Sequence, residues 1–412
     1  MNTDGDTDRH CDILVCGAGY VGLATAVAIK QARPSLKILL VDAAPEGVWK
    51  KDGRASAIAA AAQAMLTSLG VWDKLVDGAQ PINEMIVTDS RTSDPVRPVF
   101  LTFHGEAAPG QPFAHMVMNR DLNGALRSRA EALGIEILQK TPIAGLDLAS
   151  ATANATAEDG SRFRARLVIA ADGVRSKLRD WAGIRTVSWK YGQSGIVCTV
   201  AHERPHNGRA EEHFLPAGPF ATLPLPGNRS SIVWTERTAD AERLVKADSL
   251  LFEAELESRF GRQLGAITVE SEPRAWPLGL TLARAFVTHR LALAGDAAHG
   301  IHPIAGQGLN LGFKDAAALA EVIVESDRLG QDFGQEDVLE AYQRWRRFDT
   351  VRMGATTDIL NRLFSNDIGP LRMIRDVGLG LVDRMPGLKR GFIAEAAGRS
   401  GAAPRLLKGE AI

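Results

Sequence analysis

The feature that most constrains this chain is a glycine motif near its start, Gly17-Ala-Gly19-Tyr-Val-Gly22. A short apolar run at residues 12–16 precedes the motif, and a segment rich in helix formers, residues 22–30, follows it. In this context Gly17 permits a tight turn, Gly19 lets the backbone approach a pyrophosphate, and Gly22 lets the helix pack closely on the strand. The motif predicts a βαβ unit whose helix N-terminus faces the phosphates of a dinucleotide.

Two later segments follow further buried-strand patterns, at residues 166–171 and 290–294. They read Ala171-Asp172-Gly173-Val-Arg175-Ser176 and Gly295-Asp296-Ala-Ala-His299, the second running on to Gly306-Gln-Gly308-Leu309-Asn310. A simple nicotinamide dehydrogenase has no reason to carry either segment, so the three motifs together indicate an extended dinucleotide, FAD. No His or Cys stands in an obvious place for a flavin link, and we expect FAD to be bound without a covalent bond.

Single residues of these motifs have expected roles in binding. Asp42 ends the second strand, where its carboxylate can accept hydrogen bonds from a ribose. Asp296 can meet a ribityl hydroxyl of the flavin. A helix at residues 311–324 would point its positive dipole end and free amides at the flavin ring. The residues leading into that helix are Gly306, Gly308, Leu309 and Asn310.

Other residues have two interpretations that the sequence leaves open. Asp172 and Gly173 either cap and turn the chain into the next helix or bring backbone amides to the diphosphate. Arg54 and Arg120 either pair with a phosphate or form surface ion pairs. Asn119 is expected to N-cap a helix at residues 119–126.

Composition narrows the class of protein. The chain has 412 residues and a formal net charge of -1, so no basic field is present to attract nucleic acid. Its cysteines, Cys11, Cys16 and Cys198, match neither a metal spacing nor a disulfide framework, and we expect no metal site. No uncharged apolar stretch approaches the ~20 residues of a membrane helix, and no signal or transit peptide is recognisable. A cytoplasmic protein is expected, with peripheral contact to the inner membrane face left open.

The pattern of elements predicts an α/β fold: a Rossmann-like FAD-binding domain, an inserted antiparallel-sheet substrate domain and C-terminal helices. We expect a flexible tail at 1–10 and a discontinuous FAD-binding domain at 11–184 and 286–350, with an excursion to the substrate domain near 80–115. Residues 185–285, with short strands broken by Pro- and Gly-rich turns, would form the substrate domain. Residues 351–412 would form the C-terminal helical region.

With these motifs in this order, the chain resembles the group A flavoprotein aromatic hydroxylases, which share the fold of para-hydroxybenzoate hydroxylase. The resemblance covers nearly the whole chain. It implies that Asp296 and the loop to Asn310 hold the flavin and that Arg54 and Arg120 also reach the cofactor. It links the Asp172 stretch to the pyrophosphate and to NAD(P)H, and puts Pro303 beside the oxygen-reacting face of the flavin.

A narrower resemblance is to the ubiquinone-biosynthesis hydroxylases that act on polyprenyl phenols. It is carried by long strings such as His299-Gly-Ile-His302-Pro303-Ile-Ala-Gly306 and Leu360-Asn-Arg-Leu-Phe364-Ser-Asn. It implies that NAD(P)H docks transiently to reduce FAD, that O2 reacts at flavin C4a, and that one oxygen atom passes to a polyprenyl phenol. A polyprenyl tail would require a long apolar tunnel, and residues around 214–235 are expected to form part of its wall. No protein acid or base is assigned, because His299 and His302 are expected to be structural. A hydroxylase of another aromatic and a catalytically silent flavoprotein scaffold remain as alternatives.

The C-terminal stretch 352–396 interleaves apolar residues at helical spacing with basic ones. Two interpretations stay open for this stretch. Its helices either cap the core with a solvated basic face, or rest on a membrane or on partner hydroxylases. The basic residues concerned are Arg352, Arg362, Arg372, Arg375, Arg384, Lys389 and Arg390.

Overall fold

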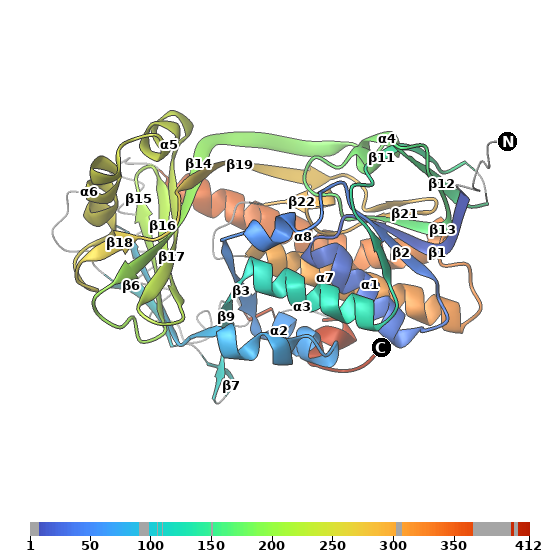
Figure 1. The fold of residues 1–412 in the computed structure, drawn as a ribbon, viewed down its shortest axis with the longest axis horizontal. Coiled ribbons are helices and arrows are strands. Elements are labelled where there is room, and N and C mark those ends of the chain that lie inside the picture. Colours follow the sequence, from blue (N-terminus) through green and yellow to red (C-terminus); the bar gives the residue numbers. More distant parts are fainter. Residues whose placement is uncertain are drawn as a thin grey trace.

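The structure is a computed structural model that describes residues 8–89, 99–104, 106–108, 110–149, 151–301, 307–365, 397–398 and 403–412. The chain forms a helix-covered sheet, which carries the glycine motif, and a second sheet with two short helices (Figure 1). Two long strands run from one part to the other. This is the α/β arrangement with an inserted sheet that the sequence predicts.

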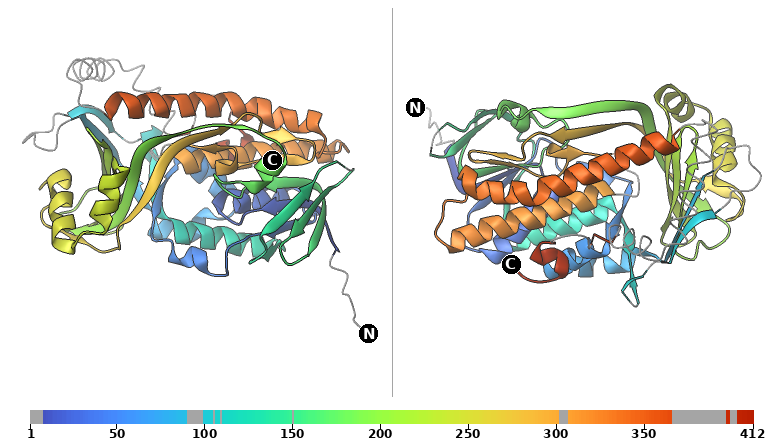
Figure 2. Two further views of the ribbon diagram at one scale, coloured as in Figure 1. Left: turned by 90° about the horizontal axis from the view of Figure 1, so that it is seen from above. Right: turned by 180° about the vertical axis from the view of Figure 1, so that it is seen from behind.

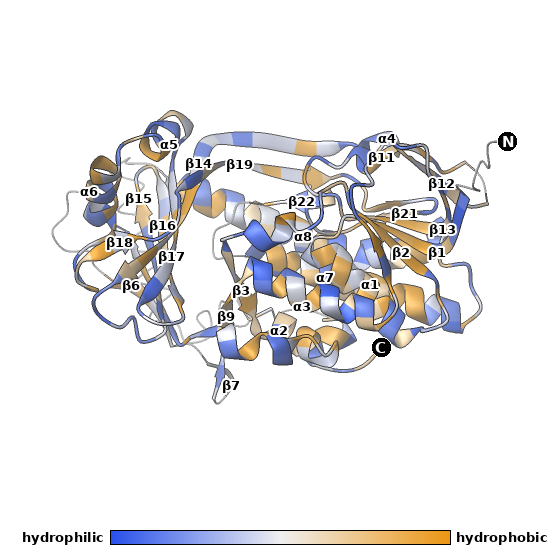
Figure 3. Cartoon of the chain, viewed as in Figure 1, coloured by the Kyte–Doolittle hydropathy of each residue, from blue (hydrophilic) through white to orange (hydrophobic). Residues whose placement is uncertain are grey.

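The first sheet has the strand order β10-β2-β1-β13-β12-β11, and β21 pairs with β13 on a separate branch. Its central strands pair in parallel, as expected for apolar runs buried on both faces. All four residues of β2 and the last four of β1 are buried, and Figure 3 shows these strands in the hydrophobic colour. The strands are β1 (Asp8–Cys16), β2 (Ile38–Val41), β10 (Glu136–Leu138), β11 (Ile143–Asp147), β12 (Ala153–Ala157), β13 (Arg162–Ala170), β20 (Val287–Thr288) and β21 (Leu291–Leu293).

Long helices cover this sheet. Helix α1 packs against α3 and α7, and α7 packs against α8, which lies beside it in the view from behind (Figure 2). Helix α1 ends just before Pro34, because the residue preceding a proline disfavours the helical conformation. The helices are α1 (Tyr20–Ala32), α2 (Ala60–Ser68), α3 (Asn119–Ala132), α4 (Lys177–Trp181), α7 (Gln307–Arg328) and α8 (Glu336–Phe364).

The second sheet has the order β22-β19-β14-β17-β16-β15-β5-β6, with β18 paired to β14. Strands β5 and β6 come from the predicted excursion near 80–115. Most pairings are antiparallel, but β5, which comes from an earlier part of the chain, runs parallel to β15. The strands are β5 (Glu84–Asp89), β6 (Val99–His104), β14 (Thr186–His202), β15 (Arg209–Leu215), β16 (Gly218–Leu225), β17 (Arg229–Arg237), β18 (Ile267–Val269), β19 (Arg274–Ala283) and β22 (His299–Gly300).

Helices α5 (Thr238–Val245) and α6 (Ser249–Phe260) cover the outer face of this sheet. A buried cluster that includes Phe220, Trp234 and Phe252 fills the space between them. The opposite face of the sheet turns toward the part that carries the glycine motif. The remaining elements are η1 (Val48–Lys51), β3 (Ala55–Ala59), η2 (Trp72–Lys74), η3 (Val76–Gly78), β4 (Gln80–Ile82), β7 (Glu106–Ala108), β8 (Gln111–Pro112), β9 (Ala114–Met118), η4 (Gly295–Ala297) and η6 (Arg405–Lys408).

The long strands β14 and β19 tie the two parts together, and β22 joins the second sheet directly after the Gly295-Asp296 motif. A division of the chain at residue 350 falls inside α8, which continues to Phe364. Within the described ranges, no helix is both long and apolar enough to cross a membrane, and no group of His, Cys, Asp and Glu could hold a metal ion.

Candidate active site

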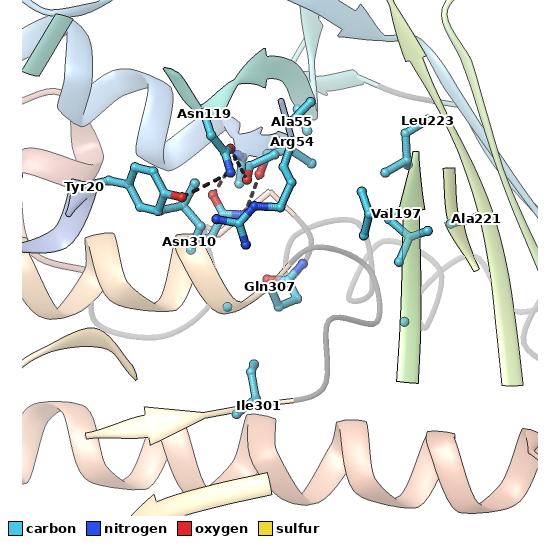
Figure 4. Close-up of a pocket in the computed structure, with 18 of the residues that line it drawn as sticks. Tyr20, Arg54, Ala55, Asn119, Val197, Ala221, Leu223, Ile301, Gln307 and Asn310 are labelled. Carbon is cyan, nitrogen blue, oxygen red and sulfur yellow. Dashed lines mark hydrogen bonds between the residues drawn. The ribbon is translucent and has the colours of Figure 1, made fainter. Parts of the chain in front are cut away.

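A cavity of about 550 Å³ lies where the carboxyl ends of the parallel strands face the second sheet. Ligands of open α/β sheets bind at this edge. Figure 4 shows Tyr20, Arg54 and Asn119 on one side of the cavity and Val197, Ala221 and Leu223 on the strands opposite. The cavity therefore has a polar end, near the glycine motif, and an apolar end, against the second sheet.

The three sequence motifs meet at the polar end through backbone hydrogen bonds. The Ala171 amide donates to the Cys16 carbonyl over 2.8 Å, and the Ala294 amide donates to the Ala170 carbonyl over 2.9 Å. The motifs therefore lie side by side, because each directly follows one of the adjacent strands β1, β13 and β21. Gly173 and Asp296 line the cavity together with Gly19.

The glycine loop is shaped as its sequence predicts. Gly17 has a φ of +113°, and a Cβ on it would collide with the Ala171 carbonyl. A Cβ on Gly22 would collide with the Gly17 carbonyl, so the helix can approach the loop only without a side chain there. A Cβ on Gly19 would meet no atom of the described residues within 4 Å, and Gly19 lines the cavity. Open space therefore lies beside the backbone where a pyrophosphate is expected.

Asp42 faces the glycine loop from the end of β2. One carboxylate oxygen accepts the Ala18 amide over 2.6 Å, and the other accepts the Ala44 amide over 2.7 Å. Asp42 is not among the residues that line the cavity. The carboxylate lies at the end of β2, where Rossmann-type folds place the group that binds a ribose.

Asp172 and Gly173 make the turn into α4. The Asp172 carboxylate accepts the Lys177 amide over 3.1 Å, whereas the N-cap residue of α4 is Ser176, which accepts the Arg179 amide over 3.0 Å. Gly173 has a φ of +87° and lines the cavity, but Asp172 does not. The turn-forming interpretation of this pair has direct hydrogen bonds behind it, and a role beside a diphosphate stays a prediction.

Asp296 follows β21 and presents its carboxylate to the cavity. Burial raises the pKa of the carboxyl above its usual value, and His299 and then Arg54 oppose this effect. The residue is accessible from the cavity that it lines. Gly295 before it packs against Val21 of the glycine motif. No hydrogen bond to the Asp296 carboxylate is formed by the residues described, so it is available to a ligand.

A buried ionic network supports the Asp296 loop from behind. Asp315 of α7 binds His299 and accepts the Gly295 amide over 3.0 Å, while Arg346 of α8 donates to the other oxygen over 2.9 Å. All three side chains are almost completely buried. Burial alone would raise the pKa of Asp315, but His299 and Arg346 outweigh burial and hold the pKa below its usual value. His299 is thus enclosed and paired, as expected for a structural histidine.

The N-terminus of α7 opens onto the cavity. Gly308, Leu309 and Asn310 line it, and the amides of a first helical turn have no acceptor within the helix. The Asn310 side chain accepts the Ala59 amide and donates to the Ala57 carbonyl, each over 2.9 Å, which fixes α7 against β3. The predicted site residues Pro303 and Gly306, and also His302, lie outside the described residues.

Arg54 belongs to a polar network at the cavity. It forms a two-point ion pair with Asp52, at 2.8 and 2.7 Å, and its guanidinium lies 5.4 Å from the Trp276 ring centre. Burial would raise the pKa of Asp52, but the hydrogen bonds and charge of Arg54 keep it below its usual value. Arg54 also lines the cavity, so the ion pair leaves the guanidinium beside the expected cofactor.

The prediction that Asn119 N-caps a helix is wrong. Asn119 is the first residue of α3, and the N-cap residue, Met118, makes no side-chain cap. The Asn119 side-chain Nδ2 donates to the Tyr20 hydroxyl over 3.1 Å, and its Oδ1 accepts a hydrogen bond from the Ser56 hydroxyl over 2.7 Å. The side chain is recruited by partners that are distant in sequence, and these hold it at the cavity.

Arg120, the next residue, is not brought to the cavity. Its side chain is exposed, and it approaches Asp121 at 3.6 Å. This geometry fits the surface ion pair that the sequence left open. A contact of Arg120 with the cofactor stays a prediction.

The wall formed by the second sheet is mainly apolar. It includes Ala221, Leu223 and Val233 from the stretch that the sequence places in a substrate cavity, together with Val197 and Leu278. A buried acid, Glu212, interrupts this wall. Small and branched apolar side chains of this kind suit a hydrocarbon ligand.

The polar end fits FAD. Among the described residues, space is left beside the Gly19 backbone, the Asp296 carboxylate has no hydrogen-bond partner, and a helix N-terminus opens at Gly308. These groups match the pyrophosphate, the ribityl chain and the electron-rich edge of a flavin in turn.

Comparison with known proteins agrees with this fit. A family described as "FAD binding domain" matches residues 10–352. The ubiquinone hydroxylase UbiL of Rhodospirillum rubrum is 44% identical over 412 residues, which cover 98% of this chain and 94% of that protein. The chain belongs to the FAD-dependent aromatic hydroxylases.

Other relatives support the same assignment for this flavoprotein. The 3-demethoxyubiquinol 3-hydroxylase of Escherichia coli is 32% identical, with 95% of this chain and 100% of that protein covered. The crystal structure of p-nitrophenol 4-monooxygenase PnpA from Pseudomonas putida has the same fold, with a TM-score of 0.77 at 18% identity, and covers 96% of this chain and 100% of that one. The flavoprotein is an FAD-dependent monooxygenase, which confirms the cofactor and the fold class predicted from the sequence.

Several residues of the site were missed by sequence reasoning. Tyr20 and Asp52 join the polar network, and burial raises the pKa of Tyr20 to about 12. Asp315 and Arg346 form the buried support of the Asp296 loop. The sequence offered one signal for this support: each of two helices that otherwise bury apolar faces carries a charged residue. Only the three-dimensional structure shows that these two residues pair.

Proposed function

We propose that this flavoprotein hydroxylates the aromatic ring of a polyprenyl phenol in ubiquinone biosynthesis. The relatives named ubiquinone hydroxylase and 3-demethoxyubiquinol 3-hydroxylase support this proposal, because they match nearly the full length of the chain. The single structural observation that carries the proposal is the cavity, which joins a flavin-compatible polar end to an apolar wall. A phenol ring with a hydrocarbon tail requires both ends.

FAD supplies the redox chemistry when it is bound: it accepts a hydride from NAD(P)H and activates O2, so that one oxygen atom enters the ring and the other leaves as water. The protein binds and orients. In our proposal the Gly19 backbone approaches the pyrophosphate, Asp42 accepts a ribose hydroxyl, and Asp296 accepts a ribityl hydroxyl. The amides of Gly308 and Leu309, at the positive end of α7, stabilise negative charge on the reduced ring.

The apolar wall has two tasks in this proposal. It receives the ring and the first part of the tail, and it keeps water away from the reacting centre. Val197, Ala221 and Leu223 lie opposite Arg54 and Asn119 in Figure 4, so a ring held between them would lie between the polar network and the second sheet.

The test is turnover of the purified holoenzyme with NAD(P)H, isotope-labelled O2 and a short-chain prenyl phenol. We expect substrate-stimulated NAD(P)H oxidation and a product that carries one labelled oxygen atom on its ring. A simple benzoate is the matched comparison, and labelled product from the benzoate alone would assign the enzyme to another aromatic substrate. Absence of substrate-stimulated flavin reduction with either compound would leave only the scaffold alternative.

We further propose that the flavoprotein meets its substrate at a membrane surface, because a polyprenyl phenol partitions into lipid. Support comes from the sequence of the C-terminal stretch, in which basic and apolar residues alternate at helical spacing. Such a surface combines apolar burial with attraction to anionic headgroups. Residues 366–396, which include most of this stretch, lie outside the described residues.

A further inference from the structure

One carboxylate interrupts the apolar wall of the cavity, and its place is fixed by strand register. Val197 of β14 pairs with Val233 of β17, which pairs with Ala221 of β16. Ala221 pairs with Glu212 of β15, which pairs in parallel with Val87 of β5. Directly paired residues point to the same face of a sheet. Glu212 therefore stands in a row with four apolar residues and is the only ionisable residue of that row.

Neighbours in β15 show which face this row occupies. His213 points to the outer face, where its ring nitrogen bonds the Thr88 hydroxyl over 2.6 Å and its other nitrogen lies 3.2 Å from Glu211. Because side chains alternate along a strand, Glu212 points to the opposite face with Ala210. Ala210 lines the same cavity, so Glu212 faces the space between the second sheet and the FAD-binding part.

Glu212 has no polar partner among the described residues. It is 5% exposed and lines the cavity, yet no hydrogen bond or ion pair reaches its carboxylate there. Burial raises the pKa of Glu212 to about 7, and no charged neighbour contributes to this shift. An unpaired buried carboxyl is unfavourable, and such groups commonly mark functional sites.

The other titratable groups that the described residues place near this face are these. Glu211, the preceding residue of β15, also lines the cavity, but its carboxylate lies 3.2 Å from the His213 ring on the outer face. Asp89 of β5 lies diagonally from Glu212, since it pairs in register with Phe214. Tyr20, Arg54 and Asp296 stand at the polar end of the cavity. Neither strand that pairs with β15 places a charged residue directly opposite Glu212, where Ala221 and Val87 stand.

We propose that Glu212 is the catalytic base that binds the substrate's phenol hydroxyl and accepts its proton, an inference that rests on the proposed hydroxylase function. The O–H bond of the phenol breaks as a new O–H bond forms on the carboxylate, and the bonding pair stays on the phenol oxygen. That electron density activates the ring carbons toward the incoming oxygen atom. The proton returns to solvent when the product leaves.

The first test compares holoenzyme variants over a pH range from about 6 to about 10, which spans the ionisation of a carboxyl near neutrality and that of a free phenol. In the wild type, kcat/KM for hydroxylation should rise with pH through about 7, because the ionised carboxylate is the active form. Glu212→Gln should lower hydroxylation about 100-fold at neutral pH. The variant's rate should rise instead toward the phenol pKa, about 10.

Two variants separate this role from a structural one. Glu212→Asp keeps a carboxylate. This variant should recover part of the hydroxylation rate and should show the rise of kcat/KM with pH near neutrality. Glu270→Gln removes an exposed carboxylate of the same domain, paired with Arg229 at 2.6 Å, and should behave as the wild type. FAD content should be equal in all of them, because Glu212 lies on the second sheet. A Glu212→Gln variant that keeps the wild-type rate and the wild-type rise of kcat/KM near pH 7 would overturn the proposal.

A binding experiment keeps this test distinct from the proposed function. The affinities of a short-chain prenyl phenol and its methyl ether are measured with the oxidised holoenzyme by the change in flavin absorbance. The phenol should bind more tightly than the ether, by a margin that grows as pH rises through about 7 and disappears in Glu212→Gln. Equal affinities in the wild type would refute the role of Glu212, even if turnover succeeds. Failure of turnover with this margin intact would refute only the hydroxylase proposal.

Discussion

At the scale of single residues, we expect FAD binding to depend on a carboxylate that forms no hydrogen bond with the described residues. Asp296 presents such a carboxylate to the cavity. Asp296→Ala should weaken FAD binding about ten- to a hundredfold, the effect of losing a buried hydrogen bond worth ~1–3 kcal/mol. Flavin retained after dialysis gives the measurement, with Asp240→Ala, a surface residue paired with Arg243, as the control. Full flavin in the Asp296 variant would remove the role proposed for this carboxylate.

Gly19 allows a cleaner experiment than the other glycines of its motif. A Cβ on Gly17 or Gly22 would strike backbone, so those variants are expected to misfold. Gly19→Val should fold normally, because a Cβ there meets nothing within 4 Å, but the new side chain occupies the space expected for the pyrophosphate. We expect a folded protein with little flavin, measured by absorbance and circular dichroism.

Gly78→Val is the matched control for this substitution. Gly78 also has open space around its Cβ, lies on the exposed η3 turn, and does not line the cavity. The control should keep its full flavin content. If Gly19→Val binds FAD as well as this control does, the glycine loop is not the pyrophosphate site.

At the scale of elements, α7 and α8 are locked together by the buried pair of Asp315 and Arg346. Arg346→Met would leave the buried Asp315 charge without its arginine partner, and breaking a buried pair typically costs about 3–5 kcal/mol. Urea unfolding of the holoenzyme should show this loss. Arg344→Met removes an exposed ion pair with Glu340 on the same helix, so a change below about 1 kcal/mol is expected. Equal stability of the two variants would contradict the support assigned to this network.

Elements were predicted well where one local pattern fixes them. The apolar runs before Gly17, Ala171 and Gly295 are strands β1, β13 and β21, because a strand buried on both faces needs little information beyond continuous hydrophobicity. The prediction that Asn119 caps a helix was wrong because contacts with residues distant in sequence decide where this side chain lies. The side-chain amide of Asn119 forms hydrogen bonds with Ser56 and Tyr20, which are far away in the chain, and these contacts override the local preference for capping.

The candidate site divides in the same way. The glycine loop and Asp296 could be found from the sequence, since their function is tied to the turn directly after a strand. Glu212 could not, because β15 reads as two adjacent acids followed by His213, and only pairing with Ala221 shows which acid faces the cavity. Local sequence patterns cannot identify residues whose role depends on the register of strands that are distant in the chain.

At the scale of the whole molecule, the remaining question is how a lipid-soluble substrate reaches the cavity. If the C-terminal stretch rests on a membrane, the protein should co-sediment with anionic liposomes at low salt and be released at high salt, because headgroup attraction is screened by ions. A variant with four cations of this stretch changed to Gln should bind much more weakly. The four residues are Arg372, Arg375, Lys389 and Arg390.

The control for this experiment removes the same charge elsewhere. Four exposed, ion-paired arginines outside the C-terminal stretch, changed together to Gln, should leave liposome binding nearly unchanged if binding is local rather than a matter of net charge. These residues are Arg9, Arg229, Arg274 and Arg344. Equal loss in both variants would point to a non-specific effect of charge. No binding by the wild type would leave the C-terminal stretch with only its capping role, and the substrate would then have to reach the cavity without a membrane contact made by this stretch.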